Sequence, residues 1–479
     1  MTPLRLTPQE MLFMTLSFRP AWAVVAGVSL AVPLSAQRNV PSVYAITNAR
    51  IVPVSAPVIP TGTVVVRDGV ITAVGASAAV PGDAQVIDGT GLTVYPGFID
   101  GYGTLALPAP TSGAGGGAAG RVAAAATTRP TGAPNSTNVV GMQPEVAVVD
   151  LLDPVDASFT AAHAAGFTAA FTATGTGVFR GHAALINLIG TDVSAMIVKP
   201  NVAQSVGFSR GGGGFGGGYP SSLFAVFAAL RQELLDAQRY HELTLVYDRN
   251  PRGVKRPAYD PSLEALQPVL TRQQPVVMFA NSEREILRAL DLAKEFNLRV
   301  IIAGGSEAYL VADRLKADNV PVLLSVNFPR RSAAATGGAA GGAGAGGRGA
   351  APVDDEPELM RVLRERVEAP KAAGRLATAG VRIVFESANN FTEYLANVRR
   401  AVAAGLPADQ ALRAMTIAPA ELFGVADRMG SIETGKIANL TMTKGDLFDT
   451  SARVTQLFID GEPTIIPAPT ASAQTARTP

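Results

Sequence analysis

The stretch TVYPGFIDGYGTL, residues 93–105, combines an apolar run with a glycine-rich polar ending. Val94 to Ile99 are apolar, with the turn-forming pair Pro96-Gly97 inside the run, and the sequence DGYG follows from Asp100. An apolar run of this length, bounded by turn residues, predicts a buried strand. The acid and the flexible glycines at its end predict functional groups at the rim of a barrel, where barrel enzymes carry their chemistry.

Strand-like and helix-like segments alternate over about 300 residues of the chain, which is typical of an α/β barrel. The clearest strand candidates are continuous apolar runs at residues 275–281, 298–305, 321–327 and 381–387. Helix-length segments separate them, as in a parallel sheet buried on both faces. The pattern predicts a distorted (β/α)8 barrel of the TIM type over residues 96–424, with Gly- and Ala-rich loops at 106–144, 210–219 and 332–351.

Both ends of the chain carry short strand patterns. Asp68-Gly69 lies between the runs VVVR and VITAV, and this two-residue connection is the signature of a type I′ hairpin. Further strand patterns, ending at Asp460-Gly461, return near the other end of the sequence. Neither half is large enough to bury its own apolar face. We therefore expect residues 43–95 and 425–467 to combine into one small, discontinuous β-sandwich into which the barrel is inserted.

The composition limits the classes of function. None of the 479 residues is cysteine, which excludes disulfides, thiol nucleophiles and cysteine-bound zinc. The formal net charge of +1 gives no electrostatic support for binding to nucleic acid or to an anionic membrane surface. Three histidines, His163, His182 and His241, are the whole imidazole supply of the chain.

Residues 1–36 have the pattern of a secretory signal peptide. Arg19 precedes an apolar run from Ala21 to Leu34, and Ser35-Ala36-Gln37 follows it. About 14 apolar residues are too few to span a bilayer but suit the core of a signal peptide. We expect cleavage after Ala36 and export to the periplasm or the extracellular space, with no membrane association after cleavage. A buried N-terminal helix is the alternative.

Three segments resemble the amidohydrolase superfamily, and its imidazolonepropionase-like branch in particular: GTVVVRDGVITAVG, VIDGTGLTVYPGFID and ALRAMTIAPAELFGVADRMGSIETGKIANL. The resemblance covers nearly the whole chain after the signal peptide. It implies a barrel with a composite β-sandwich and, in active members, hydrolysis of C–N bonds other than peptide bonds. Those members use one or two divalent metals, such as zinc, to activate a water molecule.

The family's metal ligands are replaced at each position that the resemblance assigns. Family members begin the barrel with an HxH pair, and this chain has Gly101 and Gly103 around Tyr102. At the later ligand positions it has Phe279, Ser306 and Ala388. Zinc needs imidazole or anionic ligands in its first shell, so we expect no metal and no other cofactor. His182, close to the start of a strand, is a candidate for lining the same pocket.

Three carboxylates near predicted strand ends could carry out acid–base chemistry: Asp100, Glu307 and Glu386. Two acids at a suitable separation can catalyse hydrolysis without a metal. The alternative to loss of activity is therefore a working hydrolase of amides or cyclic amides with a metal-free carboxylate site.

The main hypothesis is a catalytically degenerate amidohydrolase, a pseudoenzyme that binds a small molecule or a partner chain. The partner would be a second copy of the chain or an active paralogue. A shared fold does not establish a shared activity, so the positions of the side chains at the barrel mouth decide between the two readings.

Overall fold

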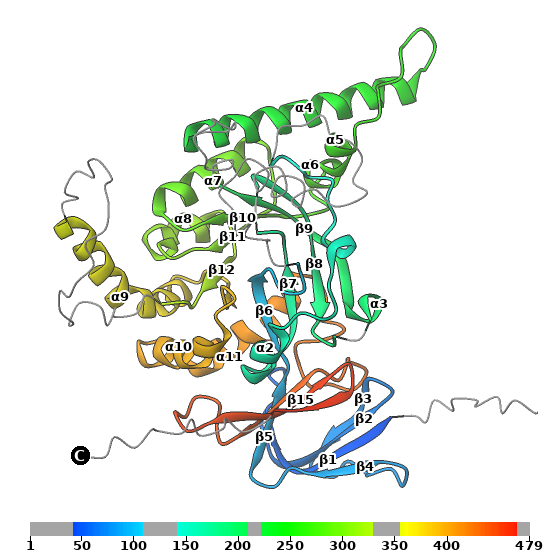
Figure 1. The fold of residues 1–479 in the computed structure, drawn as a ribbon, viewed down its shortest axis with the longest axis vertical. Coiled ribbons are helices and arrows are strands. Elements are labelled where there is room, and N and C mark those ends of the chain that lie inside the picture. Colours follow the sequence, from blue (N-terminus) through cyan, green and yellow to red (C-terminus); the bar gives the residue numbers. More distant parts are fainter. Residues whose placement is uncertain are drawn as a thin grey trace, which may run out of the picture. The chain divides into compact units, whose positions relative to one another are not determined.

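The computed structural model describes residues 42–108, 141–175, 177–190, 192–208, 222–328 and 355–466, with side chains in the last range from residue 366 (Figure 1). The predicted signal peptide and the loops at 210–219 and 332–351 lie outside these residues, as does most of the predicted loop at 106–144. Residues 41–479 form one compact unit, so the boundaries between sandwich and barrel remain a prediction.

The two chain ends build one sheet, in the order β16-β15-β14-β5-β1-β2-β3, with β4 paired to β1. Its apolar residues enclose a separate core, in which Tyr44 of β1 contacts Phe458 of β15 across a ring distance of 5.6 Å. The sheet therefore curls over its own core, which is how the two ends bury the faces that neither could bury alone. Its strands are β1 (Val43–Ile51), β2 (Ile59–Arg67), β3 (Val70–Gly75), β4 (Gln85–Asp88), β5 (Leu92–Pro96), β14 (Leu440–Lys444), β15 (Arg453–Ile459) and β16 (Glu462–Ile465).

The connection between β2 and β3 is the predicted hairpin. Asp68 and Gly69 have φ values of 49° and 81°, and Arg67 pairs with Val70. Positive φ at both central residues is what a type I′ turn requires, and an Asp-Gly pair tolerates it.

The second sheet is the nearly closed barrel, in the order β13-β12-β11-β10-β9-β8-β7-β6. Its end strands meet where Ser387, just after β13, donates its backbone N–H to Asp100 of β6 at 2.7 Å. The strands are β6 (Phe98–Gly103), β7 (Phe167–Thr172), β8 (Phe179–Asn187), β9 (Ile197–Gly207), β10 (Val276–Ala280), β11 (Val300–Gly304), β12 (Val322–Ser325) and β13 (Ile383–Glu386).

One barrel strand departs from the regular TIM pattern. β8 pairs in an antiparallel sense with both β7 and β9, whereas the other neighbouring pairs of this sheet are parallel. The first residues of β8 therefore lie beside the last residues of β7 and β9, at the carboxyl end of the barrel. This reversal is the main distortion of the predicted eight-fold unit.

Helices surround the barrel sheet (Figure 1). Apolar residues on the outward faces of the strands pack with helix residues in one large core, and a second core, which includes Ile99, Val277, Ile301 and Val384, fills the barrel interior. The helical elements are η1 (Val148–Leu151), α2 (Phe159–Ala164), α3 (Val193–Met196), α4 (Leu223–Arg249), α5 (Pro261–Ala265), α6 (Gln267–Leu270), α7 (Glu283–Glu295), η2 (Ala308–Val311), α8 (Ala312–Ala317), α9 (Asp355–Thr378), α10 (Phe391–Ala403), α11 (Ala408–Met415) and α12 (Ile417–Leu422).

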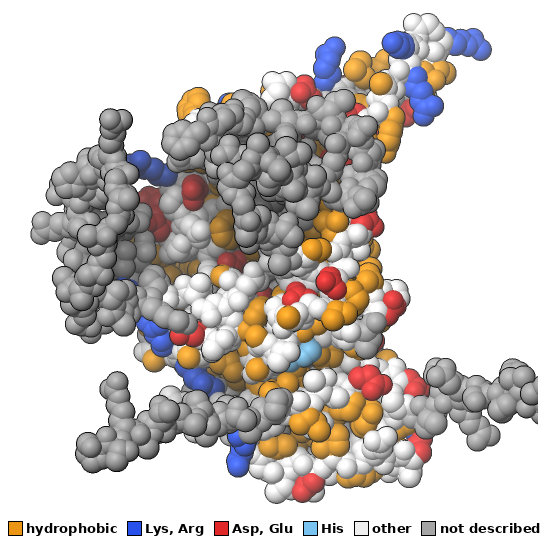
Figure 2. Space-filling view, in the orientation of Figure 1, with side chains coloured by type: hydrophobic (Ala, Val, Ile, Leu, Met, Phe, Trp, Pro, Cys, Tyr) orange, Lys and Arg blue, Asp and Glu red, His pale blue; other side chains and the backbone are white. Residues whose placement is uncertain are grey.

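The sequence pattern predicts a helix over residues 221–240 with Ser221 or Ser222 as its N-cap, whereas helix α4 continues to Arg249. Ser222 caps it by accepting a hydrogen bond from the Ala225 N–H, as expected for an N-cap. Its buried residues all precede residue 238, and its second half extends outward, with exposed apolar and basic side chains (Figure 2). Among the described helices, α4 included, none is long and apolar enough to span a membrane.

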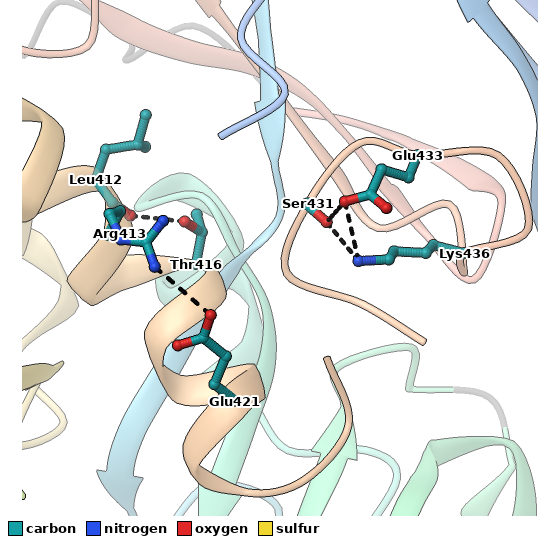
Figure 3. Close-up of polar contacts among 7 residues, drawn as sticks. All are labelled: Leu412, Arg413, Thr416, Glu421, Ser431, Glu433 and Lys436. Atoms are coloured by element: carbon teal, nitrogen blue, oxygen red, sulfur yellow. Dashed lines mark hydrogen bonds and ion pairs between the residues drawn. The ribbon is translucent and has the colours of Figure 1, made fainter. Parts of the chain in front are cut away.

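The sequence pattern predicts a single helix over residues 406–422, and this prediction is wrong, because the structure has two helices there, α11 and α12. Thr416 breaks the series with φ −128° and ψ −84°, and its hydroxyl donates to the Leu412 carbonyl at 2.7 Å (Figure 3). Pro419 has no N–H to continue a helix started in α11, so a new helix begins at Ile417. Arg413 of α11 reaches Glu421 of α12 at 3.5 Å and bridges the break.

Candidate functional site

The carboxyl end of β6 leaves no space for the side chains that the family carries there. A Cβ added to Gly101 would lie 2.7 Å from the Phe385 carbonyl oxygen and 2.8 Å from Val384 Cγ1, both on β13. At Gly103 it would lie 3.0 Å from the side-chain oxygen of Asn389. The neighbouring strand therefore occupies the volume beside Gly101 that a histidine would need.

Aromatic rings gather beside these glycines. The Tyr102 ring lies 5.6 Å from the Phe279 ring and 5.9 Å from the Phe171 ring, measured between centroids. Phe279 of β10 lies at one position to which the resemblance assigns a histidine. Tyr102 lies between Gly101 and Gly103, which occupy two further such positions. Residues from β6, β7 and β10 thus close this part of the barrel with aromatic rings, and the two phenylalanines among them offer no lone pair to a cation.

Arg180 brings a permanent positive charge into the same cluster. Its Nη1 donates a 2.8 Å hydrogen bond to the Tyr102 hydroxyl, and its guanidinium lies 5.6 Å from the centre of the Phe279 ring. The residue is only 6% exposed. Tyr102 also shares a 3.2 Å hydrogen bond with Ser205 of β9.

The reversed strand β8 explains how an arginine reaches this place. Arg180 is the second residue of β8, and the antiparallel direction puts that end of the strand at the carboxyl rim. Gly207, the last residue of β9, makes room, because a Cβ there would overlap the guanidinium of Arg180. Arg180 is not among the residues predicted from the sequence, because an arginine at the start of the apolar run VFRGHAALIN is a weak signal unless the strand direction is known.

Asp100 lies against β13. It is fully buried, and its two oxygens accept the Ser387 N–H at 2.7 Å and the Ser387 hydroxyl at 2.6 Å. Burial raises the pKa of Asp100 to about 7, although these hydrogen bonds oppose the shift. Asp100 is two residues from Phe98, so both point to the face of β6 that meets the helices.

Glu386 is the second acid of this region. It is 1% exposed, and its Oε2 accepts the Gly304 N–H at 3.4 Å. Burial, with the charge of Asp100 as a further cause, raises the pKa of Glu386 well above its usual range. The Tyr394 hydroxyl is buried with no hydrogen-bond partner among the described residues, and burial and Asp100 raise its pKa too. The structure brings Asp100 and Glu386 into electrostatic contact.

The other predicted site residues are placed elsewhere. Glu307 accepts the Glu283 N–H at 2.8 Å and so supports the start of α7, while the Ser306 hydroxyl donates to Asn281 at 3.1 Å. Ala388 follows β13 with φ 50°. His182 bonds to Gln274 at 3.0 Å and neighbours Ala183, which faces the barrel interior, so His182 faces outward. Burial lowers its pKa.

Potential metal ligands do not converge in the described part of the chain. No group of three or more His, Asp or Glu side chains there could hold a metal ion. The positions that the family uses for ligands contain glycines, aromatic rings and the nearby guanidinium of Arg180 instead. The residues present do not fit the metal centre that the family implies.

A family model with the description "Amidohydrolase family" matches residues 269–464 of the chain. This part of the chain belongs to the amidohydrolase family. Among curated proteins, no relative matches it. The assignment to the imidazolonepropionase-like branch remains a prediction.

Solved structures share the fold of this chain. An amidohydrolase from Thermotoga maritima MSB8 aligns with a TM-score of 0.68 and 22% identity, over 88% of this chain and 99% of that one. A Xaa-Pro dipeptidase with bound methionine aligns with a TM-score of 0.52 and 15% identity, over 88% and 100%. A prolidase complexed with N-methylphosphonate-L-proline gives 0.51 and 16%, over 88% and 100%. At these identities the likeness concerns the fold alone.

Proposed function

We propose that this chain is a catalytically degenerate member of the amidohydrolase superfamily, which binds a small molecule or a partner chain without a metal centre. The observation that carries the proposal is the placement of Arg180 against Tyr102 and Phe279. A divalent cation beside a guanidinium in a buried site would be strongly repelled, because charges interact more strongly there than in water. Phe279 offers no ligand atom, and the Tyr102 oxygen already accepts the hydrogen bond from Arg180.

Gly101 supports the same proposal independently. A histidine at this position would collide with the backbone of β13, so restoring the family motif by substitution requires the end strands of the barrel to separate. The contact between β6 and β13 therefore supports a site without the family's ligands, in addition to the side chains themselves.

Metal content of the purified full-length chain tests the proposal. The protein is incubated with excess Zn²⁺ or Mn²⁺, dialysed, and measured by inductively coupled plasma mass spectrometry, with thermal unfolding followed with and without each metal. We expect much less than one ion per chain and no metal-dependent shift in Tm. One or more tightly held ions per chain, together with a raised Tm, would overturn the proposal.

A metal-free hydrolase is the second candidate function, and the paired acids Asp100 and Glu386 favour it. Their raised pKa values would keep a proton available near neutral pH, as general acid catalysis requires. Both acids are almost completely buried, however, and neither lines the cavities of about 510 and 440 Å³ at the other end of the barrel. Turnover of an amide or cyclic amide that Glu386→Gln abolishes would establish this function; no turnover across a broad panel would exclude it.

Export, and pairing with a second copy or an active paralogue, are parts of the proposal that rest on the sequence. Cell fractionation with mass spectrometry of the N-terminus tests cleavage after Ala36. Light scattering during size-exclusion chromatography tests self-association. A monomer that remains in the cytoplasm with its N-terminus intact would contradict both parts.

A further inference from the structure

The amino-terminal end of the barrel carries a cavity of about 510 Å³, remote from the Arg180 cluster. Its walls are the residues that lead into β10, β11, β12 and β13. Leu290, Leu298, Val320 and Leu422 contribute apolar surface, and four cations line it: Arg272, Lys294, Arg299 and Arg382. Concave sites with a partly apolar wall and a few fixed polar groups are the usual form of small-molecule sites.

The positive charges of this cavity are not cancelled by carboxylates. None of the four cations forms an ion pair with any acid in the described part of the chain. The two acids in the cavity wall already face other cations: Asp318 pairs with Arg314 at 2.5 Å, and Glu421 pairs with Arg413 at 3.5 Å (Figure 3). Lys294 lies in the last turn of α7, where it also complements the helix dipole. The helix dipole does not explain the three arginines, Arg272, Arg299 and Arg382.

Two of these arginines are held in place by neutral acceptors. Arg272 Nη1 donates to the backbone oxygen of Asn297 at 3.0 Å and to its side-chain oxygen at 2.6 Å. Arg299 Nη1 donates to the Arg272 carbonyl at 3.2 Å. Hydrogen bonds to carbonyl groups orient a guanidinium without removing its charge, so the two cations are arranged before any ligand arrives.

The backbone of Arg272 is unusual for its residue type. Its φ is 60°, in the left-handed region, whereas the residues with similar values after the next two helices are Asn297 and Asn319. Asparagine and glycine are the residues that normally end a helix this way. An arginine is therefore conformationally unfavourable at position 272. Unlike the asparagines at the two comparable positions, it contributes a guanidinium to the cavity wall.

We propose that this cavity binds a small anion with two or more charged oxygens, either a phosphate or a dicarboxylate. Arginine forks recognise both groups through paired N–H···O bonds. The proposal concerns the end of the barrel opposite to the Arg180 cluster, and it holds whether or not the chain catalyses a reaction.

Calorimetric titration of the full-length chain with inorganic phosphate and, separately, with succinate tests the proposal, with NaCl at equal ionic strength as the blank. We expect saturable binding of at least one of the two anions at one site per chain, and the anion that binds identifies the ligand class. Arg272→Asn and Arg382→Gln should each weaken binding by about tenfold, the typical effect of losing one charge-assisted hydrogen bond. Arg453→Gln, which removes an exposed arginine from β15, is the matched control and should bind like the wild type.

The stability of the Arg272→Asn variant separates binding from folding. Asparagine relieves the left-handed backbone but loses the exposed hydrogen bonds of the guanidinium to Asn297, so the Tm without ligand should stay close to that of the wild type. No saturable heat beyond the NaCl blank, or equal affinity in the wild type and in both cavity variants, would overturn the proposal. If Arg272→Asn fails to fold, Arg382→Gln alone decides the outcome.

Discussion

Arg180 and Tyr102 lie 78 residues apart in the sequence and are joined by a 2.8 Å hydrogen bond from the guanidinium to the phenol oxygen. Because the tyrosine oxygen accepts this bond, its hydrogen is available for Ser205 at 3.2 Å. One contact thus links β6, β8 and β9 where the superfamily places metal ligands. The guanidinium thus places a positive charge of the chain itself in this part of the barrel.

Replacing Arg180 with leucine should lower the free energy of unfolding by about 1–3 kcal/mol, the usual result of removing a buried hydrogen-bond partner. Tyr102 would lose its donor, and the Phe279 ring would lose the cation above it. Urea denaturation followed by circular dichroism measures the change. Arg453→Leu is the control, and an equal loss in both variants would mean that the buried cluster contributes nothing specific.

Alanine at Gly101 should destabilise the barrel by about 1–3 kcal/mol, because overpacking a filled core forces backbone shifts. The added carbon would lie within 2.8 Å of β13 atoms. Gly75→Ala is a matched control, since a Cβ at Gly75 would meet nothing within 4 Å. We expect that control to be neutral or slightly stabilising in the same denaturation assay. Comparable midpoints for the two variants would show that the β6–β13 contact tolerates a side chain.

The buried Asp100 predicts a pH dependence of stability. Its pKa is about 7 in the folded chain against 3.8 for an exposed aspartate, so the folded state binds the proton more tightly. The stability is therefore fully present below about pH 4 and falls as the pH rises toward 7, by an amount on the order of 3–4 kcal/mol if the group behaves alone. Glu386 shifts in the same direction.

Asp100→Asn should flatten this dependence between pH 5 and pH 8. The asparagine keeps an oxygen for the Ser387 N–H, and its amide can donate to the Ser387 hydroxyl. Urea denaturation at several pH values measures the slope. If the wild type and Asp100→Asn have equal slopes, the carboxyl of Asp100 is not the group that titrates.

The pKa shift of Glu433 predicts a pH dependence of stability with the opposite sign to that of Asp100. Hydrogen bonds from Ser55 and Ser431, with Lys436 nearby, lower the pKa of Glu433 to about 2. Figure 3 shows its contacts with Ser431 and Lys436. Glu433 therefore stabilises the fold above about pH 4.5, and this contribution is lost as the pH falls toward 2. Its side chain is 46% exposed, so the contribution should stay below about 1 kcal/mol. The difference in unfolding free energy between wild type and Glu433→Gln should shrink from pH 6 to pH 3; a constant difference would contradict the assignment.

Local patterns predicted much of the fold. The Asp-Gly hairpin, the Ser222 cap and the parallel strands β10 to β12 each depend on neighbouring residues, so they are confirmed at the expected places. The break at Thr416 was missed because a helical period continues across it, and only the backbone angles separate α11 from α12.

The candidate site depended on long-range geometry. The resemblance predicts that Gly101, Tyr102 and Phe279 lie at the family's ligand positions, and the structure brings the two rings together. The sequence does not predict Arg180 at this site, because the direction of β8 decides which end of that strand reaches the rim of the barrel. Glu307 was a reasonable candidate from its place after β11, but its carboxylate is directed at the start of α7.

Gly207→Ala offers a separate test of the Arg180 position, because a Cβ at residue 207 would overlap the guanidinium. The backbone can stay in place while the arginine side chain moves, so the cost should arise through Arg180 rather than through the strand. A double-mutant cycle with Arg180→Leu separates these sources. We expect Gly207→Ala to destabilise the wild type by about 1–2 kcal/mol, as overpacking does, and to have little effect once Arg180 is leucine. Additive losses in the cycle would mean that Gly207 is required by the backbone of β9, and that the space it leaves is not what holds the guanidinium against Tyr102.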